Sequence, residues 1–63
     1  MLKFKKQGSA LVCKNQNFHN EYEIQETEQM RYALRVNGEV IYVFDNLEYA
    51  KKVASLIEED AWN

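Results

Sequence analysis

The sequence predicts a small α+β domain, an antiparallel β-meander of three to five strands with one C-terminal amphipathic α-helix packed on one face. Three observations support this fold class. A β-rich stretch from Tyr32 to Phe44 is interrupted by Asn37-Gly38, the residues after Asn46 show helical periodicity, and short runs in the N-terminal half alternate apolar and polar side chains. We expect residues 1–63 to form a single compact domain, because a chain of this length holds one small core.

The N-terminal half predicts two short strands and a third, longer one. Met1 to Lys6 and Ala10 to Lys14 are the short strands, with a reversal at Gly8-Ser9 between them and a turn at Asn15-Gln16-Asn17 after them. The third strand follows, because apolar Phe18, Tyr22 and Ile24 alternate with polar neighbours in the period-2 pattern of a half-buried strand. Glu26 to Gln29 would form the turn after it.

The stretch from Tyr32 to Phe44 predicts a β-hairpin. Asn-Gly is the preferred two-residue loop of a type I′ turn, because both central residues must adopt positive φ. Such a loop fixes the register of the two strands. The predicted core face pairs Val36 with Glu39, Leu34 with Ile41 and Tyr32 with Val43. The other face pairs Arg35 with Val40, Ala33 with Tyr42 and Arg31 with Phe44.

A helix is predicted to begin near Asn46. Asp45 would cap its N-terminus, and Glu48 could reach back to the cap. We expect the apolar side to pack on the face of Leu34, Ile41 and Val43. That side comprises Leu47, Ala50, Val53, Ala54, Ile57 and Ala61, flanked by Tyr49 and Leu56, and the opposite side carries Lys51, Lys52, Ser55, Glu58 and Glu59.

The composition argues against catalysis. One cysteine and one histidine provide neither an internal disulfide nor the four ligands of a structural zinc site. Two isolated glycines exclude a phosphate-binding loop, and Cys13, His19 and scattered carboxylates do not form a nucleophile and base set. We therefore predict no enzyme activity, no catalytic residues, no metal site and no cofactor.

The same features predict a cytoplasmic protein without a membrane anchor. Met1 to Lys6 alternate apolar and basic residues instead of forming the apolar core of a signal peptide. No apolar run approaches the roughly 20 residues that cross a bilayer. The net charge of -2 gives no general attraction to nucleic acid, although Lys3, Lys5, Lys6 and Lys14 make the N-terminal part basic.

Three surfaces are candidates for partner binding. The first is the second hairpin face, because aromatic residues and arginine are enriched at interfaces. It could be covered by Leu2, Phe4, Leu11 and Val12, by a second copy, or by a foreign protein. The candidate residues are Arg31, Arg35, Val40, Tyr42 and Phe44 on this face, an acidic band of Glu21, Glu23 and Glu26 continued by Glu28, and Trp62, which is either packed on the sheet or a contact anchor.

The chain is very short, has no catalytic groups, and combines an N-terminal meander with a capped C-terminal helix. In these features it is similar to small phage and mobile-element proteins that block host machinery, including anti-CRISPR and polymerase-inhibiting types. The similarity covers no motif and implies only that a complementary surface is sufficient for function. The leading hypothesis is a protein-binding module that inhibits or modulates a larger partner, with homodimerisation as a related possibility. The alternative is a small nucleic-acid-binding regulator that uses the basic N-terminal part and exposed aromatic residues.

Overall fold

The structure is a computed structural model that describes residues 2–14 and 18–61. Within these ranges the chain forms five strands and one helix. The elements are β1 (Lys5–Gln7), β2 (Ala10–Cys13), β3 (Tyr22–Glu26), β4 (Tyr32–Val36), β5 (Glu39–Phe44) and α1 (Leu47–Ala61). The predicted reversal at Gly8-Ser9 is confirmed, and the turn predicted at 15–17 lies outside the described residues.

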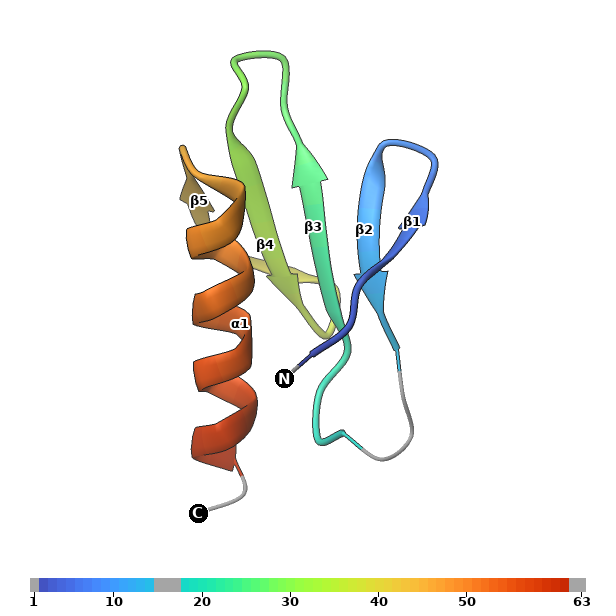
Figure 1. The fold of residues 1–63 in the computed structure, drawn as a ribbon, viewed down its shortest axis with the longest axis vertical. Coiled ribbons are helices and arrows are strands. Elements are labelled where there is room, and N and C mark those ends of the chain that lie inside the picture. Colours follow the sequence, from blue (N-terminus) through green and yellow to red (C-terminus); the bar gives the residue numbers. More distant parts are fainter. Residues whose placement is uncertain (1, 15–17, 62–63) are drawn as a thin grey trace.

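The strands form one antiparallel sheet whose spatial order, β1-β2-β3-β4-β5, is the order of the chain. The backbone of α1 lies close to β3, β4 and β5, so that the helix covers one side of the sheet (Figure 1). We call this side the helix face and the opposite side the open face. The predicted meander with a single C-terminal helix is confirmed.

The type I′ hairpin turn is also confirmed. Asn37 and Gly38 have φ values of 54° and 86°, the left-handed conformation that this turn requires at both positions. Asn37 also ties the turn to the residues before β3, since its Oδ1 accepts a hydrogen bond from the Glu21 N–H (2.9 Å) and its Nδ2 donates one to Asn20 Oδ1 (2.9 Å). The asparagine therefore supplies both the backbone conformation and a link between two neighbouring loops.

The predicted hairpin register is correct next to the turn and wrong beyond it. Val36 pairs with Glu39 and Arg35 with Val40, but the next pair is Leu34 with Tyr42, because Ile41 forms a β-bulge. An extra residue in one strand reverses the face of every side chain that follows. Ile41 and Val43 are therefore exposed instead of facing the core, and Phe44 is buried on the helix face with Leu34.

The core lies between the helix face and α1. Leu34, Ile24 and Tyr22 are the largest fully buried side chains, and they pack against Ala50 and Ala54 of the helix. The small alanines let the helix backbone approach the sheet closely.

Leu2 belongs to the same cluster, and Phe4 and Leu11 pack against it. The N-terminal segment therefore extends the cover of the helix face beside α1. These three residues therefore do not cover the opposite side of the hairpin, whereas Val12, the fourth residue of that alternative, lies on the open face in the row of Arg35 and Val40.

The helix cap differs from the prediction by one residue. The Tyr49 N–H donates to Asn46 Oδ1 (3.0 Å) and the Ala50 N–H donates to the Asn46 carbonyl (3.1 Å), so Asn46 is the N-cap and Asp45 precedes it. Both residue types are favoured caps, and they are adjacent. Glu48 then occupies the second helical position, which does not correspond to the capping box expected from Asp45.

The cap assignment gives the first testable prediction. Asn46→Ala should lower the free energy of unfolding by about 1 kcal/mol, because it removes the side-chain acceptor for the Tyr49 N–H. Asp45→Ala is the control and should cost less, since Asp45 contributes only a favourable charge near the helix N-terminus. Urea titration followed by circular dichroism measures both, and a larger loss for Asp45→Ala would contradict the assignment.

Candidate interaction surfaces

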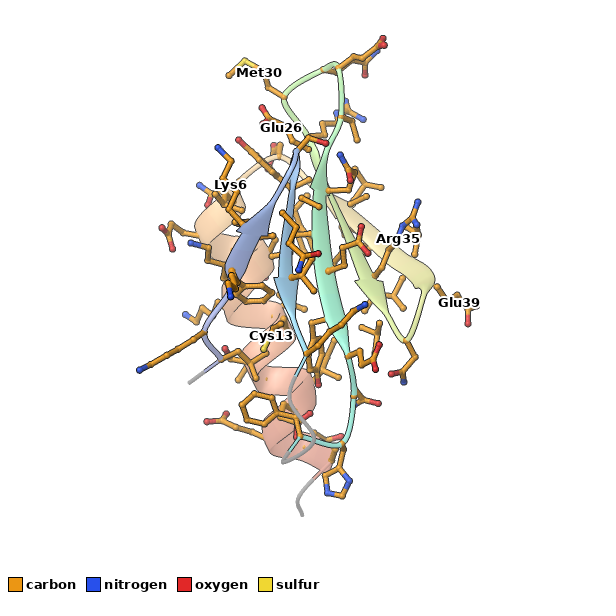
Figure 2. The ribbon with its side chains drawn as sticks, turned by 90° about the vertical axis from the view of Figure 1, so that its right-hand side faces the viewer. Lys6, Cys13, Glu26, Met30, Arg35 and Glu39 are labelled. Atoms are coloured by element: carbon orange, nitrogen blue, oxygen red, sulfur yellow. The ribbon has the colours of Figure 1, made fainter. Side chains whose placement is uncertain are left out.

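The open face of the sheet carries polar and aliphatic side chains in equal number along its two central rows. One cross-strand row consists of Lys5, Val12, Glu23, Arg35 and Val40, and the next of Gln7, Ala10, Gln25, Ala33 and Val43. Val12, Ala10 and Ala33 are each only 8% exposed although no described element covers them. Long polar neighbours such as Arg35, which points away from α1 in Figure 2, bury small apolar residues in this way. Three apolar residues of this face are therefore buried within the sheet itself, whereas Val40 and Val43 on the same face remain exposed.

The exposed apolar residues of the sheet are concentrated in β5. Val40 and Ile41 are both 46% exposed, Val43 is 43% exposed and Tyr42 is 63% exposed. β5 is the last strand of the sheet, so one row of its backbone N–H and C=O groups faces outward. We call these outward backbone groups together with the side chains of Val40 to Val43 the β5 edge.

A shallow hollow of about 290 Å³ lies beside the C-terminal end of β5. Its walls are aromatic, because the Tyr42 and Phe44 ring centroids are 4.9 Å apart and the Phe44 and Tyr49 centroids 5.5 Å apart. Arg31 and Asp45 also line it, so that one cationic and one anionic side chain lie beside the rings. The hollow has the size and the mixed lining of a pocket for one large side chain.

The structure brings only part of the predicted hairpin surface together. Arg31, Tyr42 and Phe44 surround the hollow, with Phe44 8% exposed. Arg35 and Val40 are paired on the open face, so they do not share a surface with the two aromatic residues. Sequence reasoning missed Tyr49, whose position at the start of the helix brings its ring against Phe44.

The predicted acidic band is divided among separate places. Glu23 lies on the open face directly opposite Arg35, a favourable cross-strand pair of opposite charges. Glu26 is opposite Tyr32 at the end of β3, Glu21 precedes the strand, and Glu28 is in the exposed turn after it. Glu26 therefore lies on the other face of β3 from Glu23, so the predicted band as a whole is not one surface. Trp62 lies outside the described residues.

Glu58 is the polar residue that sequence reasoning placed wrongly. It was assigned to the solvated side of the helix, but it is 5% exposed and lies in the core. Its Oε1 accepts a hydrogen bond from the Tyr22 hydroxyl (2.8 Å) and its Oε2 accepts one from the His19 backbone N–H (2.8 Å). The sequence does contain a signal for this position: Ala50, Ala54 and Glu58 are each four residues apart, so Glu58 lies on the same side of the helix as the two buried alanines.

The two titratable groups buried near Glu58 are poor nucleophiles. Burial raises the pKa of the Tyr22 hydroxyl to about 12, the hydrogen bond from Asn20 lowers it, and the hydrogen bond and charge of Glu58 raise it. Burial also raises the pKa of the Cys13 thiol, a backbone hydrogen bond with Lys3 lowers it, and the Glu58 charge raises it further. A thiol reacts through its thiolate, so a raised pKa makes Cys13 unreactive.

The raised Tyr22 pKa predicts a loss of stability in alkali. A hydroxyl whose pKa is higher in the folded than in the unfolded state stabilises the fold fully below the unfolded value, about 10, and this contribution disappears as the pH rises through about 12. Free energies of unfolding measured between these limits should therefore fall more steeply for the parent than for Tyr22→Phe. Parallel curves for the two proteins would contradict the burial of the hydroxyl.

A second concave region, the basic cleft, lies along the outer side of β1 and β2. Its volume is about 540 Å³. Lys3, Lys5 and Lys14 line it together with Phe4 and Phe18, and none of its described lining residues is acidic. In the sequence these lysines share only their location in the N-terminal part of the chain. In the structure the antiparallel pairing of β1 with β2 brings them to the lining of one cleft.

Among residues 2–14 and 18–61 there is no group of three or more His, Cys, Asp or Glu side chains that could hold a metal ion. No helix in the described part of the chain is long and apolar enough to cross a membrane. Comparison with protein-family models, with curated proteins and with solved structures finds no match to this chain. Its function is therefore inferred from its own surfaces.

Proposed function

We propose that this chain is a non-enzymatic cytoplasmic protein-binding module, and that it takes up an extended segment of a larger partner protein as an additional strand along the β5 edge. The observation that carries the proposal is the exposure of five of the six residues of β5 in the last strand of the sheet. An exposed strand edge is a template for a further strand, which binds through main-chain hydrogen bonds.

The contrast between the two edges of the sheet supports the choice of β5. β1 is only three residues long and contains Lys5 and Lys6, and short strands with lysine are common protection against edge pairing. β5 is six residues long and has no charged residue from Val40 to Phe44. The bulge at Ile41 is its main irregularity, and the residues after the bulge return to regular pairing.

The neighbouring surface indicates the chemistry of the partner segment. The uncharged stretch of β5 from Val40 to Phe44 favours an apolar or β-branched strand, because cross-strand pairs of such side chains stabilise a sheet. The aromatic hollow between β5 and α1 would receive one large side chain of that segment, and Arg31 and Asp45 would contact its polar margin. A partner segment bound in this way is no longer available for its own interactions. Binding alone would therefore inhibit the function of that segment, without catalysis.

A displayed library of random linear peptides tests the proposal directly. Selection on the parent protein should enrich extended sequences rich in β-branched and aromatic residues, and bound peptide should slow amide hydrogen exchange in β5. Tyr42→Lys should abolish binding by the selected peptides. Leu56→Lys is the matched control, because Leu56 is a similarly exposed apolar residue on α1, and it should leave binding unchanged.

Two results would overturn the proposal. Peptides that bind Tyr42→Lys as well as the parent would place binding elsewhere on the molecule. Sedimentation of the parent as a dimer at micromolar concentration, with Tyr42→Lys monomeric, would assign the β5 edge to a second copy of the chain instead of a foreign segment.

A further inference from the structure

The second surface to consider is the basic cleft, at the opposite edge of the sheet from β5. The chain has a net charge of -2, yet three lysines and no described carboxylate line this region. Two acidic residues of neighbouring elements do not line the cleft. Glu58 is in the core, where Tyr22 and the His19 N–H donate to it, and Glu23 is separated from Lys5 by Val12 on the open face.

The charge of the cleft favours a negatively charged ligand. Lys5 pairs with Val12 in the β1–β2 ladder, and Lys3 and Lys14 line the same concave region. Several lysines gathered in one concave region, with no acidic residue among its described lining, attract anions.

The aromatic side chains define which anion fits best. Phe4 and Phe18 are both half-buried, packing partly against the core while also lining the cleft. A positively charged groove with aromatic side chains is the combination that binds single strands, because phosphates lie near the lysines and bases stack on the rings. An acidic peptide would use the lysines and leave the rings without a role.

We propose that the basic cleft binds single-stranded nucleic acid, with Lys3, Lys5 and Lys14 contacting phosphates and Phe4 and Phe18 stacking against bases. The net negative charge does not prevent this, because none of the described residues that line the cleft is acidic. Exposed Glu28 is in the turn after β3, and Glu59 and Asp60 are at the C-terminal end of α1. The site is separate from the β5 edge, so binding at one edge does not depend on binding at the other.

Fluorescence anisotropy with a labelled single-stranded oligonucleotide of about ten residues tests this inference. Three phosphate contacts at about 0.7 each predict a slope near -2 for the logarithm of the association constant against the logarithm of salt concentration. Raising salt from about 50 mM to about 200 mM should therefore weaken binding roughly 16-fold. Lys14→Gln should reduce the slope by about 0.7.

Matched variants distinguish binding in the basic cleft from nonspecific attraction to lysines elsewhere on the surface. Lys3→Gln/Lys14→Gln should lose most binding, whereas Lys51→Gln/Lys52→Gln removes the same charge from α1 and should leave binding nearly unchanged. Phe18→Leu keeps an apolar side chain but removes the ring, and it should weaken binding at least about fivefold. Tyr42→Lys on the β5 edge should not reduce it.

Three outcomes would overturn the inference. Equal losses in the two double-lysine variants would show general charge attraction, and unchanged affinity in Phe18→Leu would exclude stacking. Equal affinity for an oligoglutamate peptide of the same charge would show that the cleft takes acidic peptides. Circular dichroism of each variant confirms that lost binding does not reflect lost fold.

Discussion

Glu58→Ala is expected to lower the free energy of unfolding by about 3 kcal/mol, because it leaves the buried Tyr22 hydroxyl and the part-buried His19 N–H without their acceptor. The Tyr22 hydroxyl and the His19 N–H both donate to the Glu58 carboxylate, at 2.8 Å each. The carboxylate is 5% exposed, so water cannot readily replace these bonds. The substitution also removes side-chain volume from the core.

Two further variants isolate the hydrogen bonds from the loss of volume. Glu58→Gln keeps the shape and one acceptor oxygen, so its cost should be intermediate between those of the parent and Glu58→Ala. Glu59→Ala changes the neighbouring, exposed carboxylate and should alter stability by less than about 0.5 kcal/mol. Urea titration gives the free energies, and hydrogen exchange of the His19 amide reports the specific bond. Equal midpoints for Glu58→Ala and Glu59→Ala would contradict the buried position.

Leu34→Ala should be the second severe substitution. Leu34 is 0% exposed and lies at the centre of the core, beside the helix alanines. Truncating such a leucine costs about 3 kcal/mol, from lost transfer energy and the cavity that remains. A 63-residue domain has a total stability of only about 3 to 9 kcal/mol, so this substitution should remove between a third and all of it and lower the melting temperature strongly.

Leu56→Ala is the matched control for this prediction. Leu56 is the same residue type but is 53% exposed on α1, and its truncation should cost less than about 0.5 kcal/mol. Thermal melts of the two variants make the comparison. Similar melting temperatures would mean that the core is not centred on the helix face of β4.

The elements that sequence patterns predicted correctly are those fixed by local chemistry. Asn37-Gly38 requires a type I′ turn wherever it joins two strands, and the helical spacing of Ala50 and Ala54 is sufficient to find the buried side of α1. The strand order follows the general tendency of consecutive strands to pair, helped by the two-residue connections between β1 and β2 and between β4 and β5. These features depend on residues a few positions apart.

The features that were missed depend on tertiary packing. Nothing in the run Val40-Ile41-Tyr42-Val43 distinguishes a regular strand from one with a bulge at Ile41, because every residue is β-branched or aromatic and suits either face. Glu58 was placed in solvent by its charge, although residues 36 and 39 positions away provide its donors. The sequence predicted only part of the hollow beside β5, because its lining residues come from three separate places: the turn before β4, β5 with the residue after it, and α1.

The strand order also determines how the chain assembles. Because each strand pairs with the strand beside it in sequence, every hairpin closes only a short loop, which costs little conformational entropy. The sheet can therefore form by successive local steps, whereas the Glu58 hydrogen bonds must wait until α1 docks on strands already in place. We expect docking of the helix to be the cooperative step that joins the hairpins into one folding unit. The hydrogen bonds of the Glu58 carboxylate then connect α1 to Tyr22 and His19.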